Sequence, residues 1–567
     1  MTDRSPKPSP VDHPPRTEAY RDARAQPRAT DWRYLLPPSG DRGIGRILLA
    51  GGTDAIASAV RQALVADEFF RDRCPPAAAD VAVVLRDSSL SIEAVAEMLA
   101  PGGVLYWEVS RARPGRLRVT PAYARAALRR HGLTPIESYW VTSGASGPSM
   151  HLPLGRDGAV GWYFAVHHGP SSRLRRILGR VLRFLAQGRG GRLERLVPVF
   201  AITARRLTVE GESAPGVTAL ATADVPAWAV AGDARPILLG GGEGPWSRVV
   251  LLPFAHGADR PAGVIKVARS SAYEGGLVAE QRALASLRAT VPASIRMGVP
   301  EPLGRVRVLD HPGSAETYRP GASIAARSSR SDVRRATRRA DLERAASWLR
   351  DLHDATGSGS AGLGPSRIAV GGLIDRYTQI FGSDETDDGL FRRLRHAGVG
   401  SGDLLVPQVM RHRDFGPWNV LVDTDSQVSV IDWEVAGPGP PLVDLVYFVA
   451  HWTWIVAASS SVREDAQLLG RLVAGDPARW HTKAGRSVIA RHALEIGLTA
   501  DPVAVLFAWT FIEQALDRHD RLVAIGDPSA ADRSSNRYVR YVSALAELPD
   551  LAGSIAGWLD AHRDGDS

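Results

Sequence analysis

Two short stretches in the C-terminal half carry acidic and amide side chains in a pattern suited to phosphoryl transfer. Residues 412–419 read HRDFGPWN and place Asp414 five positions before Asn419, while residues 431–434 read IDWE and contribute Asp432. Transfer of a phosphoryl group needs a carboxylate that orients a hydroxyl, together with oxygen ligands that hold Mg²⁺. Asp414 can supply the carboxylate, and Asn419 with Asp432 can supply the ligands.

The residues between the two stretches predict the strands that position them. Val420–Val422 and Val428–Ile431 are short apolar runs around the polar turn Asp423–Gln427. The second strand therefore delivers Asp432 beside the loop that carries Asp414. A three-position match to HxDxxxxN alone can occur by chance in 567 residues. The order of loop, strand, turn, strand and acid is the order that a kinase metal site requires.

HRDFGPWN together with IDWE resembles the aminoglycoside phosphotransferase and choline kinase family, whose members share the protein-kinase-like fold. The resemblance implies that Asp414 is the catalytic base, that Asn419 and Asp432 hold Mg²⁺, and that His412 braces the loop. It also implies a structural role for Asp444. The chain lacks the DFG and APE signatures of protein kinases, which favours a small-molecule hydroxyl acceptor over a protein.

Lysine usage points to the nucleotide-binding half of such an enzyme. Lysine and arginine together number 69, yet only Lys7, Lys266 and Lys483 are lysines. Lys266 lies in the apolar strand pattern of residues 262–268, where a kinase places its phosphate-binding ammonium group. A strand lysine that points to solvent is the alternative. Glu280, on the amphipathic helix expected next, is the natural ion-pair partner of Lys266.

A glycine run precedes this strand. The apolar residues 237–239 lead into three glycines, Gly240, Gly241 and Gly242, and residues 248–253 are expected to form the return strand. Glycines let backbone amides approach phosphates closely, so these three are candidates for a loop that covers ATP. The run is not GxGxxG, and a simple hairpin turn remains open. Residues 316–321 are expected to link the two lobes.

Composition restricts the class of protein. The length of 567 residues predicts two or more domains, and the hydrophobic content of 44% and charged content of 23% are typical of globular proteins. The net charge of +8 could attract nucleic acid or an anionic membrane, but no nucleic-acid-binding motif occurs, and nucleic acid is not an expected partner. The single cysteine, Cys74, excludes a disulfide framework and predicts a cytoplasmic location. No apolar run is long enough for a transmembrane segment.

The N-terminal third is expected to form a separate α/β domain over residues 32–170. Residues 1–31 are rich in Pro, Arg and Asp, which predicts a disordered tail without a signal peptide. Strands are expected at residues 46–50, 80–85, 104–109, 135–141 and 159–166, and helices at residues 54–65, 91–99 and 121–131. This alternation predicts a parallel sheet with helices on its faces.

The stretch LAPGGVL at residues 99–105 resembles the strand-entry turn of class I S-adenosylmethionine-dependent methyltransferases. That family has Gly-x-Gly after its first strand, whereas this chain has only Gly51 and Gly52 in succession. The segment between Val65 and Asp80 leaves room for barely one element, so the domain is shortened. A degenerate domain used for recognition or assembly is the favoured interpretation. A methyltransferase with an accessory kinase-like part, and a non-catalytic nucleotide-binding scaffold, are the alternatives.

The remaining segments complete the expected organisation. Residues 171–219 form a basic amphipathic linker, whose helix packs against a domain or contacts a membrane surface. Residues 220–322 form the N-lobe of a bilobal α+β kinase-like domain and residues 323–560 its C-lobe. In the C-lobe, His353 is expected to be a core or capping histidine. Residues 384–388 are expected to be an acidic loop, either solvated or lining the site of a cationic acceptor. The predicted activity is ATP- and Mg²⁺-dependent phosphorylation of a small-molecule hydroxyl.

Overall fold

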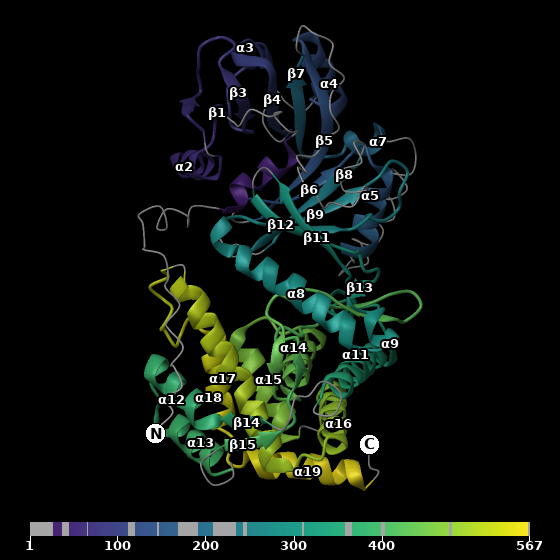
Figure 1. Cartoon of the computed structure of the whole chain (residues 1–567), viewed down its shortest axis with the longest axis vertical. Helices are drawn as coiled ribbons and strands as arrows, with labels where there is room; N and C mark the ends of the chain where they lie inside the picture. Colours follow the sequence, from purple (N-terminus) through teal and green to yellow (C-terminus); the bar gives the residue numbers. More distant parts are fainter. Residues whose placement is uncertain are drawn as a thin grey trace, which may run out of the picture.

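The computed structural model places an α/β unit at one end of the molecule, a strand-rich region in the middle and a helical lobe at the other end (Figure 1). It describes residues 27–36, 45–64, 66–111, 119–144, 147–167, 191–207, 234–241, 247–308, 311–357, 366–397, 403–475, 479–524 and 526–564. The glycine Gly242 and the expected amphipathic helix within residues 171–190 lie outside these ranges.

A single 12-stranded sheet runs through the first two regions, in the order β11-β12-β10-β9-β8-β6-β5-β7-β4-β3-β1-β2. In the α/β unit, β1 pairs in parallel with β2 and β3, and β3 pairs in parallel with β4. Helices α2, α3 and α4 follow β1, β3 and β4 along the chain. The bounds are β1 Arg46–Ala50, α2 Asp54–Ala63, β2 Glu68–Arg71, β3 Ala79–Val84, α3 Ile92–Met98, β4 Leu99–Ser110 and α4 Pro121–Arg130. The parallel sheet predicted from the alternating pattern is therefore present.

The end of the α/β unit differs from the prediction in two places. Residues 159–166, expected to be a strand, belong to α5 (Asp157–Trp162) and a π-helical turn (Tyr163–His167). A short apolar run fits a buried helix as well as a strand, which explains the error. Residues 199–206, placed in the linker, form β7 and pair antiparallel with both β4 and β5 (Leu133–Gly144). Part of the expected linker is thus an interior strand of the sheet.

Strand β6 (Gly147–Pro153) joins the α/β unit to the N-lobe. It pairs antiparallel with β5 on one side and with β8 (Arg235–Gly240) on the other. From β8 the sheet continues antiparallel through the other N-lobe strands to its edge at β11. Their bounds are β9 Arg248–Phe254, β10 Val264–Ala268, β11 Pro302–Val308 and β12 His311–Glu316. The two units therefore share one hydrogen-bonded sheet.

The 3₁₀ segment η1 (Pro27–Leu35) makes a second connection between the α/β unit and the N-lobe. Its Asp31, expected in a disordered tail, is fully buried and accepts two hydrogen bonds from Arg269, at 2.9 and 2.8 Å. Tyr34 packs in a core cluster with Val249 and Ile265 of the N-lobe strands. The tail prediction is thus wrong for this segment, because buried partners far along the chain hold it.

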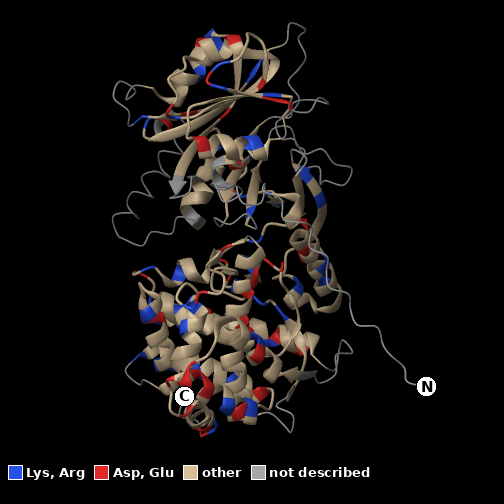
Figure 2. Ribbon diagram, turned by 90° about the vertical axis from the view of Figure 1, so that its left-hand side faces the viewer, with Lys and Arg blue, Asp and Glu red and all other residues tan. Residues whose placement is uncertain are grey.

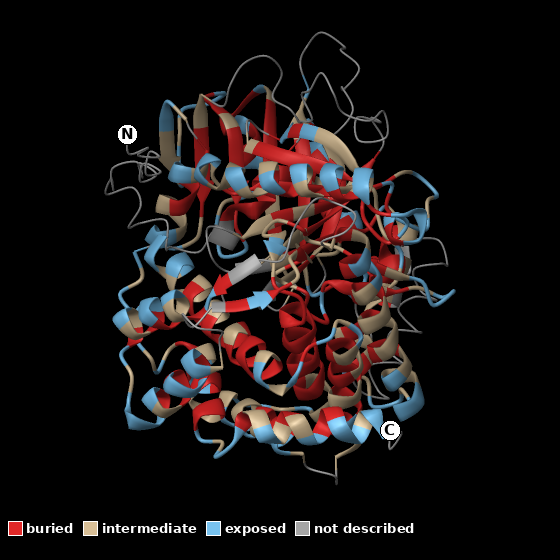
Figure 3. Cartoon of the chain, turned by 60° about the horizontal axis from the view of Figure 1, so that its bottom comes forward, coloured by how far each residue is buried: buried red, intermediate tan, exposed pale blue. Residues whose placement is uncertain are grey.

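The C-lobe is predominantly helical, and its residues form the largest hydrophobic core cluster. Buried residues lie inside this lobe and within the sheet, while exposed residues lie on the outer helices (Figure 3). The helices are α11 Arg335–Thr356, α12 Val370–Phe381, α13 Glu385–His396, α14 Val443–Ala457, α15 Val462–Ala474, α16 Trp480–Glu495, α17 Ala500–Ala524, α18 Arg537–Ala546 and α19 Leu551–Arg563. Short elements complete the described chain: α7 Gly191–Glu194, η3 Ser271–Tyr273, α9 Ala293–Arg296, α10 Ile324–Ser328, β13 Ala322–Ser323, β14 Ser366–Ala369, β15 Asp403–Val406, β16 Val409–Arg411, β17 Val420–Val422, β18 Val428–Val430 and β19 Gly437–Gly439.

Helix α8 (Glu274–Thr290) lies between the sheet and the helical lobe (Figure 1). Its Leu284 and Leu287 belong to the core cluster of the C-lobe. The chain then passes from β12 through residues 317–321 to β13, where the lobes were expected to be linked. Among the described residues, no single helix is long and apolar enough to span a membrane; α14 and α15 meet that measure only together, across a 117° bend.

Candidate active site

The HRDFGPWN loop begins directly after β16 and is held by the carboxylate of Asp444 on α14. Asp444 accepts the backbone N–H of His412 at 2.6 Å and that of Arg413 at 3.3 Å. It also accepts Nε of Arg411 at 3.2 Å, and Arg411 makes a second ion pair with Glu513 at 2.7 Å. Arg413 has a positive φ of 63°, a strained conformation for a non-glycine residue. Asp444 thus fixes the backbone of the loop in an otherwise unfavourable turn.

Asp414 lies in a cluster of hydrogen-bond donors. Nδ2 of Asn419 lies 3.0 Å from Asp414 Oδ2, and the hydroxyl of Tyr447 lies 3.4 Å from Asp414 Oδ1. Burial, followed by the nearby charge of Asp432, raises the pKa of Asp414 from 3.8 to about 7. A carboxylate with a pKa near neutrality can accept a proton from a hydroxyl during the reaction.

His412 connects the two motifs. Its side chain is fully buried, and Nε2 lies 3.0 Å from the carbonyl oxygen of Ile431. Burial lowers the pKa of His412, so the ring is neutral and Nε2–H donates to that carbonyl. The ring also packs edge-on against Trp433, with centroids 4.6 Å apart. His412 therefore braces the loop against the strand end that carries Asp432.

Asn419 and Asp432 present oxygen atoms suited to Mg²⁺. The amide nitrogen of Asn419 points to Asp414, donating to its backbone oxygen as well as its carboxylate, both at 3.0 Å. The carbonyl oxygen of Asn419 is consequently the atom left for a ligand. Asp432 follows β18 with a positive φ of 72°; burial raises its pKa, but Lys266 and Arg248 outweigh burial and hold the pKa below 3.8.

No cluster of three or more His, Cys, Asp or Glu side chains arranged for a metal ion occurs in the part of the chain that the structure describes. An Mg²⁺ ion bound with a nucleotide needs fewer protein ligands, because phosphates and water complete its octahedron. One carboxylate and one amide oxygen, from Asp432 and Asn419, match that requirement. The residues present therefore fit an Mg²⁺–nucleotide complex.

Lys266 is buried in β10 and surrounded by three carboxylates. Its Nζ lies 2.5 Å from Glu280 Oε1, 3.2 Å from Glu316 Oε1 and 3.6 Å from Asp432 Oδ1. Burial lowers the pKa of Lys266, but these charges outweigh burial and raise it, so the ammonium group keeps its charge. The predicted contact with Glu280 is present, and Lys266 also links the N-lobe to Asp432 of the C-lobe.

Arg248, the first residue of β9, is a second cation in this cluster that the sequence analysis did not single out. Its guanidinium lies 2.7 Å from Glu280 Oε2, forms an ion pair with Glu434 and lies 3.8 Å from Asp432. Glu280 therefore bridges Lys266 and Arg248, one carboxylate oxygen to each. In the sequence, Arg248 is marked only by its position at the start of the strand that follows the glycine run. Because arginine is common in this chain, that position alone did not identify Arg248 as a site residue.

Two cations, Lys266 and Arg248, thus lie among four carboxyl groups at the boundary between the lobes. The carboxyl groups are those of Glu280, Glu316, Asp432 and Glu434. Burial raises the pKa of Glu316 to about 7, against the opposing charge of Lys266. Burial and Asp432 raise the pKa of Glu434. An excess of negative charge held at close quarters favours protonation or the entry of a further cation. The four carboxyl groups would carry more negative charge than Lys266 and Arg248 neutralise if all four were ionised.

The glycine run is described only in part. Gly240 ends β8, and the N–H of Gly241 donates to the carbonyl oxygen of Arg248 at 3.1 Å. A Cβ added to Gly241 would clash with that same oxygen. The two residues therefore form the base of a β8–β9 hairpin next to the Arg248 cluster, while Gly242 lies outside the described residues.

The acidic segment at residues 384–388 is not a loop. Asp384 caps α13 by accepting the N–H of Asp387 at 2.9 Å, and Asp387 is fully buried against Arg533 at 2.6 Å. These two carboxylates stabilise the helix and its packing. His353 is a core residue as predicted: it is buried, and its Nδ1 lies 3.3 Å from Nε2 of His492.

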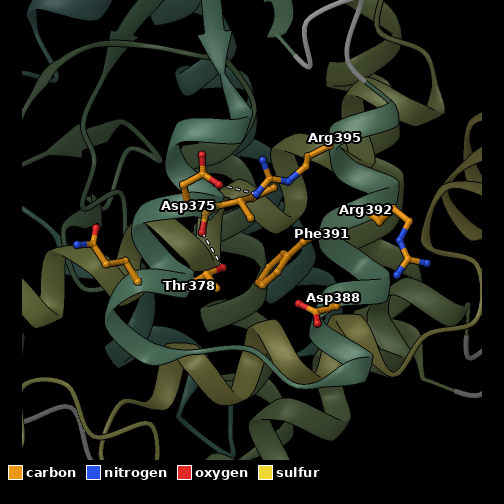
Figure 4. Close-up of a pocket in the computed structure, with 8 residues that line it drawn as sticks. Asp375, Thr378, Asp388, Phe391, Arg392 and Arg395 are labelled. Atoms are coloured by element: carbon orange, nitrogen blue, oxygen red, sulfur yellow. Dashed lines mark hydrogen bonds and ion pairs between the residues drawn. The ribbon is translucent and has the colours of Figure 1, made fainter.

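A surface pocket of the C-lobe lies between α12 and α13, and none of the residues predicted for catalysis, nucleotide binding or metal binding lines it (Figure 4). Asp375 and Arg395 form an ion pair of 2.6 Å across it, and Asp388 and Phe391 also line it. Its lining mixes two acidic and two basic side chains. None of the residues that line it belongs to the charge cluster at the lobe boundary.

The loop after β1 in the α/β unit is closed by its own carboxylates. Gly51 and Gly52 have positive φ angles of 82° and 77°. The N–H of Gly51 donates to Asp72 at 3.0 Å, and that of Gly52 donates to Asp87 at 2.8 Å. Because both amides already have acceptors, this loop offers them to no ligand in the observed conformation. This observation favours the degenerate interpretation of the unit.

Residues 254–481 match the model of the phosphotransferase enzyme family. No curated protein matches the chain. Among solved structures, the chain aligns with a protein of Ralstonia eutropha provisionally described as an aminoglycoside phosphotransferase, at 16% identity and a TM-score of 0.38, over 60% of this chain and 94% of the other. It aligns with the aminoglycoside phosphotransferase APH(3'')-Id of Streptomyces rimosus at 19% identity and a TM-score of 0.32, over 49% and 93% of the two chains. The family match identifies this part of the chain as a small-molecule phosphotransferase enzyme.

Proposed function

We propose that this protein transfers the γ-phosphoryl group of ATP to a hydroxyl group of a small molecule. The observation that carries the proposal is the convergence of Lys266, Glu280 and Asp432 from two lobes, together with a half-buried carboxylate, Asp414, whose pKa is raised to about 7. This convergence occurs inside a region that matches a phosphotransferase family. The α/β unit serves as a structural partner of the N-lobe, and a cytoplasmic location is part of the same proposal.

Each residue has a role in the proposed reaction. Asp414 orients the acceptor hydroxyl and receives its proton. The acceptor oxygen forms a bond to the γ-phosphorus while the bond from that phosphorus to the β–γ bridging oxygen breaks, and ADP leaves. Lys266, oriented by Glu280, holds the phosphates. Gly240 and Gly241, at the end of β8, start the loop that covers the nucleotide, whereas Gly242, the third candidate from the sequence, lies outside the described residues.

Asn419 and Asp432 would hold Mg²⁺, which when bound neutralises negative charge on the phosphates. His412 and Asp444 are positioning residues, because they fix the loop that carries Asp414 and Asn419. A binding measurement separates this role from turnover: Asp432→Asn should weaken the Mg²⁺ dependence of nucleotide binding, read by titration of a fluorescent nucleotide with and without Mg²⁺.

The direct test is a screen of ATP consumption against a panel of hydroxylated metabolites, with the product identified by mass spectrometry. Asp414→Asn should reduce turnover at least 100-fold while nucleotide binding stays within a few-fold. Lys266→Met should weaken nucleotide binding. Asp425→Asn, which alters an exposed carboxylate on the β17–β18 turn, is the matched control. Phosphoryl transfer that survives Asp414→Asn within a few-fold would sink the proposal.

A further inference from the structure

Arg248 and Lys266 project from the same face of the N-lobe sheet. Strands β9 and β10 are antiparallel, and Lys266 lies opposite Val250, two residues after Arg248. Directly opposed residues share a face of a sheet, as do residues two positions apart on one strand. Glu280 contacts both cations, with Oε1 at 2.5 Å from Nζ of Lys266 and Oε2 at 2.7 Å from Nη1 of Arg248. One buried carboxylate therefore holds the two cations side by side.

The C-lobe meets this pair of cations with three successive residues of the IDWE motif, at a lobe boundary where acidic and basic residues both lie (Figure 2). Asp432 Oδ1 lies 3.8 Å from Nη1 of Arg248. The N–H of Trp433 donates to Glu280 Oε1 at 3.1 Å. Glu434 forms an ion pair with Nη2, the other terminal nitrogen of Arg248. The guanidinium of Arg248 thus joins the lobes directly, with Glu280 on one nitrogen and Glu434 on the other.

Gly276, in the first turn of α8, leaves the space in which the Arg248–Glu434 pair lies. A Cβ built at Gly276 would lie 2.8 Å from Nη2 of Arg248 and 3.6 Å from Oε2 of Glu434. A Cβ built at the neighbouring Gly275 would have no atom within 4 Å. Glycine is a poorer helix former than alanine. The close approach of Arg248 therefore gives Gly276, and not Gly275, a physical reason to lack a side chain.

The two carboxylates that hold Arg248 differ in their access to water. The side chain of Arg248 is 9% exposed and that of Glu280 is fully buried, whereas 35% of the Glu434 side chain is exposed. A buried carboxylate that loses a cation is left uncompensated, but a partly exposed carboxylate regains water. The contact with Glu434 is therefore the one that another anion can replace while Glu280 stays bound to Arg248.

We propose, on the basis of the function proposed above, that Arg248 is a phosphate-binding residue and that Glu434 is a built-in competitor for it. A phosphate group of the nucleotide displaces Glu434 from the guanidinium, and the freed carboxylate turns to solvent. A guanidinium binds phosphate oxygens through parallel hydrogen bonds, as it binds a carboxylate. The direct ion pair between the lobes is then exchanged for a contact through the nucleotide. Glu434 thereby lowers the affinity for nucleotide and slows its entry.

The first test measures the binding and association rate of the fluorescent nucleotide mant-ATP at constant Mg²⁺. Glu434→Gln removes the competing charge and keeps the shape of the side chain. It should lower the Kd by about three- to fivefold, the value of a partly exposed ion pair, and raise the association rate constant in stopped-flow mixing. Glu274→Gln, which removes a carboxylate of α8 paired with Arg305 inside the N-lobe, is the matched control and should change neither. Unchanged or weaker binding by Glu434→Gln would overturn the proposal.

A double variant tests whether Glu434 acts through Arg248. In the Arg248→Gln background, Glu434→Gln should no longer lower the Kd, because no guanidinium is left for the two anions to share. An equal gain in affinity in both backgrounds would contradict the assignment to Arg248.

Gly276→Ala and Gly275→Ala form a matched pair of steric probes. The added methyl group of Gly276→Ala displaces the Arg248 guanidinium from the place that both anions use, so the Kd for mant-ATP should rise at least twofold. The melting temperature should not fall, since alanine favours the helix. Gly275→Ala should leave the Kd unchanged, and equal Kd values for the two variants would contradict the placement of Arg248.

These measurements separate this proposal from the proposed transfer reaction, because they need no acceptor. Tighter mant-ATP binding by Glu434→Gln in a chain that phosphorylates no hydroxyl compound would support the competition and count against the transfer. Phosphoryl transfer by a chain whose Glu434→Gln variant binds nucleotide no better would do the reverse. A wild-type chain that binds no nucleotide would overturn both.

Discussion

Replacement of Asp414 by Asn should abolish turnover and at the same time stabilise the protein at neutral and alkaline pH. The pKa of Asp414 rises from 3.8 to about 7, mainly through burial. Each pKa unit corresponds to about 1.36 kcal/mol, so the ionised carboxylate costs the folded state about 4 kcal/mol. This is an upper limit, because Asn also places an amide N–H₂ beside the donors of Asn419 and Tyr447. A carboxylate tuned for proton transfer is consequently a source of instability.

The sign of the pH dependence follows from proton linkage. Between about pH 4 and pH 7 the folded protein keeps the proton on Asp414 that the unfolded chain loses. The stabilising contribution of the protonated group is therefore complete below the unfolded pKa, and it is lost as the pH rises through about 7. Glu316 changes stability in the same direction and over part of the same range. A difference between wild type and Asp414→Asn isolates the contribution of Asp414.

The assay is denaturant unfolding at pH 5, 6, 7 and 8, followed by tryptophan fluorescence. The free energy of unfolding of Asp414→Asn minus that of wild type should increase, in favour of the variant, by up to about 1.4 kcal/mol per pH unit between pH 5 and pH 7. Asp425→Asn, on an exposed turn, should show no such slope. A difference between wild type and Asp414→Asn that is equal at pH 5 and pH 8 would refute the reasoning.

Three further outcomes are expected. The kcat/KM of the wild-type enzyme should fall about tenfold per pH unit below about pH 7, because only the ionised form of Asp414 accepts a proton; a rate that is flat from pH 5 to pH 8 would contradict this. Arg248→Gln leaves Glu434 without its cation and Glu280 paired with Lys266 alone, and it should raise KM for ATP by about tenfold or more, measured at saturating Mg²⁺. Asp31→Asn removes the carboxylate that pairs with the buried guanidinium of Arg269. It should lower the free energy of unfolding by about 3–5 kcal/mol, measured by denaturant titration.

The core of the site was predictable from sequence because its residues lie in short motifs whose spacing has a physical meaning. Asp414 and Asn419 share one loop, and a two-strand hairpin delivers Asp432 beside them. Lys266 and Glu280 were predictable because a rare lysine in a strand precedes an amphipathic helix. The remaining charges of the cluster come from residues whose types are common in this chain. Arg248 and Glu316 acquire their significance only when β9 and β12 flank β10.

The prediction of the fold was right where strand pairing follows a local sequence pattern. It was wrong where partners far along the chain determine the structure of a segment. The strand at residues 46–50 has the predicted bounds. Strand β7 is separated from β4 by about ninety residues along the chain and pairs with it throughout. Local propensity contains no information about such a pairing. The same holds for β6 and β8, whose pairing fuses the two units.

That fusion makes the α/β unit a structural necessity for the N-lobe. Without it, β8 would become an edge strand with unpaired backbone groups, and exposed edges promote aggregation. Removal of residues 1–219 would take away β6, and with it Asp31, the buried partner of Arg269. The truncated chain should therefore be insoluble or poorly folded, although it retains all of the proposed catalytic residues.

Expression of residues 220–567 beside the full chain, followed by size-exclusion chromatography and thermal unfolding, measures this dependence. A substitution of Arg269 by Leu in the truncated chain removes the stranded buried charge and should recover part of the stability without restoring the covered edge of β8. A soluble, monomeric truncated chain with wild-type nucleotide affinity would show that the sheet connection is dispensable. Since Arg269 also donates to the carbonyl oxygen of Ser247, next to Arg248, loss of the α/β unit should weaken nucleotide binding before it affects the helices of the C-lobe.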